Sequence, residues 1–188
     1  MKTLITSAAC LLLLSGAASA AGTHSRSTTR EHNLRFGLDT EIGIPLGNYS
    51  DSNSVGGGAF ATADYGLLEN LSATMRFGFQ AHVNRTVGNL STRVNAMPVL
   101  FGAKYFMAPE RQGLFTTAEA GMFVLFSNVT RGALPSTGGA DARFGMGLGL
   151  GYQQSNWNVR VNVHTQDVGN FGSAMMITSG IGYQFAGI

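Results

Sequence analysis

The chain has 188 residues, a formal net charge of +2 and 12% charged residues, about half of the usual share of roughly 25%. This charge leaves no electrostatic footprint for binding nucleic acid. The chain also contains 26 glycines, about twice the usual number. After the first 20 residues, no apolar run approaches the roughly 20 residues of a membrane-spanning helix. These features favour a β-barrel, and the length suits one domain.

The first segment has the layout of a secretory signal peptide. Lys2 precedes a mostly apolar run, Leu4 to Leu14, and an Ala-x-Ala cleavage site ends at Ala20. We predict that residues 1–20 are removed. Cys10 leaves with them, so the remaining chain has no cysteine and forms no disulfide.

A polar lead-in and a barrel domain are expected to follow. Residues 21–32 are polar and show no period, so we predict a flexible periplasmic lead-in. His24 and His32 lie in it, and we interpret them as solvated side chains and not as metal ligands. The barrel domain is predicted over residues 33–188.

The first predicted strand, residues 34–44, has two unlike faces. Leucine, phenylalanine and isoleucine alternate with a face that carries Arg35, Asp39, Glu41 and glycines. A face with two acids and a base cannot form a hydrophobic core. The pattern therefore predicts a membrane barrel, whose apolar face meets lipid and whose polar face lines the interior.

The next strands repeat this alternation. Residues 57–65 are predicted to turn Asp64 inward, and residues 71–83 to turn Arg76 inward, with a tight turn between them. The fourth strand, residues 92–106, contains Pro98, which cannot donate to a ladder. We predict a bulge at Met97-Pro98 that shifts the phase. Arg93 and Asn95 would then face inward before the bulge, and Gly102 and Lys104 after it.

Four more strands complete the set. Residues 114–126 place Glu119 inward, residues 157–164 place Arg160 inward, and residues 175–185 form the last strand. Between them, residues 142–152 alternate large apolar side chains with Arg143 and then four glycines. We expect these glycines to face inward and leave room for long charged side chains from neighbouring strands. The prediction is an all-β, eight-stranded antiparallel up-and-down transmembrane β-barrel.

The connections alternate between tight turns and longer polar loops, as in outer-membrane barrels. The tight turns are expected on the periplasmic side and the loops outside the cell. Six aromatic residues fall at the predicted periplasmic strand ends, where an aromatic girdle belongs. They are Tyr65, Tyr105, Tyr152, Trp157, Tyr183 and Phe185.

The whole mature chain resembles the small OmpA/OmpX-like outer-membrane β-barrel family. The resemblance rests on the rhythm of strands and turns and on the ending Gly180-Ile181-Gly182-Tyr183-Gln184-Phe185. Such an alternating last strand resembles the signal read by the outer-membrane insertion machinery. Family members usually stop at the aromatic residue, whereas Ala186-Gly187-Ile188 follow it in this chain. The resemblance implies a bacterial outer-membrane location and is specific for architecture more than for activity.

The inward charges form the candidate site. They are Arg35, Asp39, Glu41, Asp64, Arg76, Glu119, Arg143 and Arg160, with Arg93, Lys104, His82 and His164 as further candidates. Eight-stranded barrels are just wide enough to be filled by side chains, and buried charges need partners. We therefore favour a paired structural network that plugs the lumen over a narrow channel.

A lipid-modifying enzyme is a further alternative, because some eight-stranded relatives deacylate lipid A with a His-x-Ser-Asn motif. In this chain His164 is followed by Thr165, Gln166 and Asp167, so the serine is missing. A soluble ligand-binding barrel is disfavoured by the charged inner faces. We therefore predict a monomeric, non-enzymatic protein without metal or cofactor, with a structural or surface-interaction role. Its expected partners are outer-membrane lipid, lipopolysaccharide and the insertion machinery; the sequence identifies no surface partner.

Overall fold

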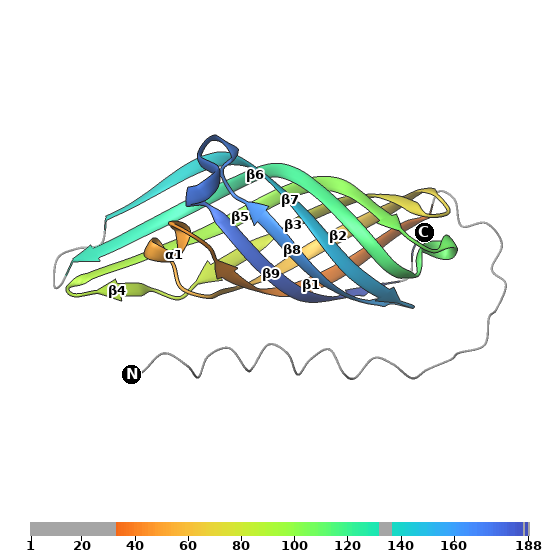
Figure 1. Cartoon of the computed structure of the whole chain (residues 1–188), viewed down its shortest axis with the longest axis horizontal. Coiled ribbons are helices and arrows are strands. Elements are labelled where there is room, and N and C mark those ends of the chain that lie inside the picture. Colours follow the sequence, from red (N-terminus) through yellow and green to blue (C-terminus); the bar gives the residue numbers. More distant parts are fainter. Residues whose placement is uncertain (1–32, 132–136, 186, 188) are drawn as a thin grey trace.

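The computed structural model describes residues 33–131, 137–185 and 187. The predicted signal peptide and lead-in lie outside these ranges. The described chain forms a closed antiparallel barrel of eight main strands, in which each strand pairs with its neighbour in sequence and β3 pairs with β5 across the short β4 (Figure 1). The eight strands are β1 (Leu34–Pro45), β2 (Gly56–Leu68), β3 (Leu71–His82), β5 (Leu90–Phe106), β6 (Gly113–Arg131), β7 (Thr137–Gln154), β8 (Trp157–Thr165) and β9 (Met175–Gln184). The predicted eight-stranded fold is thus confirmed.

Short elements occupy the connections. A one-turn helix, α1 (Tyr49–Ser52), follows β1, and β4 (Arg85–Val87) forms a hairpin with β5. Two 3₁₀ segments are η1 (Pro109–Arg111) and η2 (Val168–Ser173). Among the described residues, no helix is long and apolar enough to cross a membrane.

The two faces of the sheet are inverted relative to a soluble protein. Outward residues such as Ile42 and Leu148 are 63% and 69% exposed, whereas the inward charges Asp39 and Arg76 are only 4% and 3% exposed. Alternation along each strand places these classes on opposite faces. Large apolar side chains therefore form the outer surface, as expected for a barrel whose solvent is lipid.

Pro98 does not produce the predicted bulge. β5 keeps a single register with β6 from Leu90 to Phe106, and its register with β3 is the same on both sides of the proline. The ladder to β3 instead omits two positions, those opposite Met97 and Pro98. A local gap in hydrogen bonding thus accommodates the missing N–H without an extra residue. The phase does not change, so the prediction that Arg93 and Asn95 face inward was wrong.

The glycines of β7 face inward, but their neighbours differ from those expected. A Cβ added at Gly151 would overlap the ring of Phe115, and one at Gly145 would overlap that of Phe123. A Cβ at Gly149 would overlap Asn162. The space is therefore used by aromatic rings and an amide, and not by long charged side chains.

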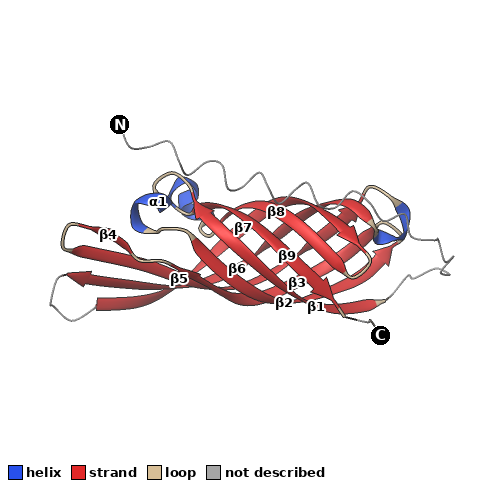
Figure 2. Cartoon of the chain, turned by 90° about the horizontal axis from the view of Figure 1, so that it is seen from below, coloured by secondary structure: helices blue, strands red, loops and turns tan. Residues whose placement is uncertain are grey.

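One wall of the barrel is much taller than the rest. β5, β6 and β7 have 17, 19 and 18 residues, whereas β8 and β9 have 9 and 10. The three long strands extend past the rim at the end that carries α1 and β4 (Figures 1 and 2). Because β7 pairs with β8 only over Met146–Gln154, its segment Thr137–Gly145 has, among the described residues, a ladder partner on the β6 side alone.

Candidate functional site

The centre of the lumen holds two arginines and three carboxylates. From β3, Arg76 reaches Glu41 Oε2 at 2.9 Å and Glu119 Oε2 at 3.1 Å, and its Nε lies 3.7 Å from Asp39. From the opposite wall, Arg160 pairs with Asp39 and lies 3.7 Å from Glu119. The guanidinium of Arg76 also covers the ring of Phe60 at 4.2 Å. All five charged side chains are at most 8% exposed.

A second polar group lies nearer the tight turns. Lys104 Nζ and Gln184 Nε2 both reach Asp64 Oδ2 at 2.5 Å. Gln184 Oε1 then accepts hydrogen bonds from Gln153 at 2.7 Å and from Arg35 at 3.3 Å. Buried polar groups are tolerated when they are hydrogen-bonded, and glutamines provide that bonding here without adding charge.

The charges of the two groups cancel. Their members are the bases Arg35, Arg76, Lys104 and Arg160 and the acids Asp39, Glu41, Asp64 and Glu119. A buried ion pair is costly to desolvate, and removing one partner leaves an uncompensated charge. Because the charges balance, removing any one of these side chains would leave an opposite charge buried without compensation.

Seven of the eight predicted lumen charges belong to these two groups. The structure places Arg143 elsewhere, on the tall part of β7, where it bonds Asp141 Oδ2 at 2.8 Å and Asp167. Its side chain is 40% exposed. Alternation assigns Arg143 to the inward face, but β8 ends below it, so this face is open at that height. Lys104, one of the further candidates, belongs to the second polar group through its ion pair with Asp64.

At the end of the barrel that carries α1, two loops meet over the lumen and form a lid that the sequence did not reveal (Figure 1). Tyr49 of α1 donates a hydrogen bond to Gln166 Oε1 at 2.8 Å, and both residues are at most 5% exposed. Gln166 Nε2 bonds Gln80 Oε1 at 3.2 Å, and Gln80 Nε2 bonds Glu41 Oε1 at 2.7 Å. Two loops are thus connected to the central charges by side-chain hydrogen bonds. Burial raises the pKa of the Tyr49 phenol.

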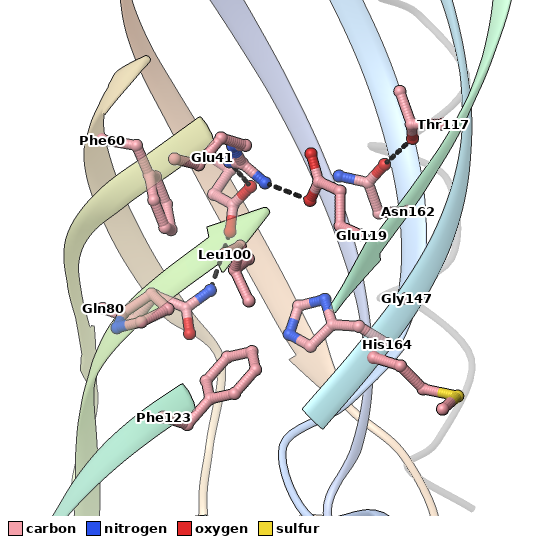
Figure 3. A pocket seen from close by; sticks show the side chains of 13 residues that line it. Glu41, Phe60, Gln80, Leu100, Thr117, Glu119, Phe123, Gly147, Asn162 and His164 are labelled. Atoms are coloured by element: carbon pink, nitrogen blue, oxygen red, sulfur yellow. Dashed lines mark hydrogen bonds and ion pairs between the residues drawn. The ribbon is translucent and has the colours of Figure 1, made fainter. Parts of the chain in front are cut away.

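The remaining free space inside is small. Between the lid and the central charges lies a cavity of about 10 Å³, which is room for one water molecule. Figure 3 shows its lining, with Glu41 and Gln80 on one side and Glu119 and His164 on the other. Glu119 Oε1 and His164 Nε2 are buried without a hydrogen-bond partner among the described residues.

The two histidines of the lumen pack against aromatic rings. His164 stacks on Phe123 at 5.8 Å, and His82 meets the edge of Tyr49 at 5.9 Å. Within the described ranges, no group of three or more His, Cys, Asp or Glu side chains is placed to hold a metal ion. His24 and His32 lie outside those ranges.

The six predicted girdle residues lie at one end of the barrel. Five of them are 37–55% exposed, and Tyr183 is half-buried. Trp157 pairs with Tyr183 at 4.8 Å between ring centroids, and Tyr183 with Phe185 at 5.6 Å. This end carries the tight turns, at the opposite end from α1 and β4 (Figure 1).

Comparison with known proteins identifies the fold. No family model matches the chain, and neither does any curated protein. Among solved structures, Ail, the attachment invasion locus protein of Yersinia pestis, is similar with a TM-score of 0.59 and 11% identity, over 82% of this chain and 99% of Ail. A complex of Ail with the heparin analogue sucrose octasulfate gives a TM-score of 0.58 at the same identity and coverage. The N-terminal β-barrel domain of Pseudomonas aeruginosa OprF gives 0.52 at 11% identity, over 82% of this chain and 98% of that domain. These likenesses confirm the predicted resemblance at the level of the fold.

Proposed function

We propose that this chain is a bacterial outer-membrane β-barrel with a closed lumen and a structural or surface-interaction role, without catalysis. The observation that carries the proposal is the inversion of its faces: large apolar side chains outside and a balanced set of ion pairs inside. Such a molecule is stable only if its outer face is covered by lipid. Its partners would be outer-membrane lipid, lipopolysaccharide and the insertion machinery, and it would act as a monomer.

The closed lumen is supported by the central ion pairs and by the lid above them. Planar-bilayer recordings of the purified protein test it directly. We expect no steady conductance, because the cavity at the central charges and the cavity beside Asp64 each have room for only about one water. A reproducible single-channel conductance would favour the narrow-channel alternative.

A surface-interaction role is supported by the tall wall. The segment Thr137–Gly145 leaves one edge of β7 without a ladder partner. Exposed strand edges pair readily with a strand from another chain. By analogy with Ail, named as an attachment protein, we propose that this edge contacts external proteins.

A charge at the edge tests this role. Lysine opposes strand addition, so Gly139→Lys, at an exposed position of this edge, should reduce the retention of cells expressing the protein on serum-coated surfaces. The control is Ser127→Lys in β6, directly opposite Gly139, in a strand paired on both sides at that position. Equal retention of cells that express the wild type, the edge variant or the control variant would contradict an edge-mediated interaction and leave the structural role.

The enzyme alternative has its own test. His164 lies inside the barrel against Phe123, away from the lipid-facing surface. We expect His164→Ala to leave the lipid A of expressing cells unchanged by mass spectrometry. A change in lipid A acylation that depends on His164 would overturn the non-enzymatic assignment.

A further inference from the structure

We propose that Arg93 and its neighbours on the outer face of β5 and β6 form a binding site for a phosphate group of lipid A in the outer leaflet. This inference rests on the proposed outer-membrane location. It starts from an arginine that faces lipid and not the lumen.

The orientation of Arg93 follows from its neighbours. Val94 packs against the cluster of Ala96, Leu100, Phe123 and Leu125 inside the barrel. Because adjacent residues of a strand point to opposite faces, Arg93 points outward. It is directly opposite Asn128 of β6. The Nε of Arg93 is buried and has no hydrogen-bond partner among the described residues.

The height of Arg93 matches the outer edge of the apolar band. Tyr105, in the girdle at the other end, lies twelve residues further along β5. At about 3.3 Å per residue and a tilt of about 40°, this separation corresponds to roughly 30 Å across the membrane. The apolar band of such barrels is about 25 Å tall, so Arg93 lies at the level of the headgroups.

The composition of the outer face changes at this height. Below it lie Met97, Val99 and Phe126, which are apolar. At and above it the other outward positions are polar and uncharged, namely Ser91, Asn128 and Thr130, and Asn95 lies one outward position below Arg93. Arg93 takes part in none of the ion pairs among the described residues. The patch thus has one cation, several hydrogen-bonding side chains and no acid.

An anionic headgroup satisfies this arrangement. A guanidinium binds phosphate oxygens through two parallel hydrogen bonds, and amides and hydroxyls supply the remaining contacts. The long side chain of arginine can extend along the barrel wall and place its charge in the headgroup layer. Lipid A supplies phosphates at that depth in the outer leaflet.

Two other arginines provide matched controls. Arg85 is opposite Thr92, and Arg131 is opposite Leu90, so both belong to the inner face of the tall wall. Both are exposed and lie at the tip of the wall. They carry the same charge on neighbouring strands, but they do not face lipid.

The test measures lipid A binding to the detergent-solubilised, folded barrel by native mass spectrometry. Removing one charge-assisted contact weakens binding roughly tenfold, so Arg93→Gln should bind bisphosphorylated lipid A about that much more weakly. Arg85→Gln and Arg131→Gln should bind it like the wild type. With dephosphorylated lipid A, the wild type and Arg93→Gln should bind alike. If Arg93→Gln does not fold, Arg93→Lys replaces it and should lose several-fold in affinity, because lysine lacks the planar fork.

Three results would overturn the site: unchanged binding in Arg93→Gln, an equal loss in Arg85→Gln or Arg131→Gln, or equal affinity of the wild type for phosphatidylglycerol. A folded wild-type barrel recovered from the outer membrane separates these results from a failure of the proposed location. If the wild type is not found there, the proposed function fails first.

Discussion

The phenol of Tyr49 donates a hydrogen bond to Gln166 Oε1 at 2.8 Å and so joins the loop between β1 and β2 to the loop between β8 and β9. These residues are 117 positions apart in the chain, and both are buried. Through Gln80 the bond continues to Glu41 in the central charge cluster. The lid is therefore part of the same polar network that fills the lumen.

Tyr49→Phe should lower the free energy of unfolding by about 1 kcal/mol, the usual net value of one hydrogen bond. Gln166 would be left with an unsatisfied buried oxygen, while packing against His82 would be kept. Urea titration of the barrel in lipid vesicles measures the change. An unchanged midpoint and slope would show that the bond does not hold the lid.

Alkaline pH should release the lid in the wild type. Burial raises the pKa of Tyr49 above the ordinary value of about 10. The neutral phenol is the form favoured in the folded state, so its contribution is complete below pH 10 and is lost as pH rises through the raised pKa. Ultraviolet absorbance should show a late-titrating phenolate that is missing from Tyr49→Phe. If the phenolate that is missing from Tyr49→Phe instead forms near pH 10, the burial of this residue is contradicted.

Arg76→Met should destabilise the barrel by about 3–5 kcal/mol, because three carboxylates would then face Arg160 alone. Arg85→Met, an exposed position at the tip of the wall, should change stability by less than about 0.5 kcal/mol. The two variants remove the same charge, so their difference isolates the effect of the lumen. Similar stability of both would show that the central ion pairs are not needed to close the barrel.

Gly151→Ala should cost about 1–3 kcal/mol, because the new methyl group would overlap the ring of Phe115. Gly172→Ala is the control, since a Cβ there meets nothing within 4 Å. Thermal or urea unfolding compares the two. If both variants match the wild type, the inward packing of Phe115 against β7 is incorrect.

Alternation in the sequence was sufficient to find every main strand and to assign most inward charges. It works in this chain because lipid and lumen demand opposite chemistry at successive residues. Alternation shows which face of the sheet a residue is on, but not how far along the barrel axis it lies. Arg143 was therefore grouped with the lumen charges, although it lies above the end of β8, beside an open rim. Proline chemistry permits either a bulge or a gap in the ladder, and only the strand registers around Pro98 distinguish them.

The lid could not be predicted from the same signal. Tyr49 and Gln166 lie in loops without a period, and their contact depends on the closure of the barrel. The partners of the β7 glycines depend on cross-strand register, which places Phe115 and Phe123 beside them. Gln80 and Gln184 were on inward faces in the sequence, but their role as connectors between charges appears only in three dimensions.

Fractionation of expressing cells, followed by gel migration in SDS with and without boiling, tests whether the protein is a closed barrel embedded in the outer membrane. Our account predicts recovery in the outer-membrane fraction and faster migration of the unboiled sample, because a closed barrel in detergent resists unfolding until it is heated. A soluble product whose migration does not depend on heating would contradict the account. The apolar outer face of the barrel would then need another explanation.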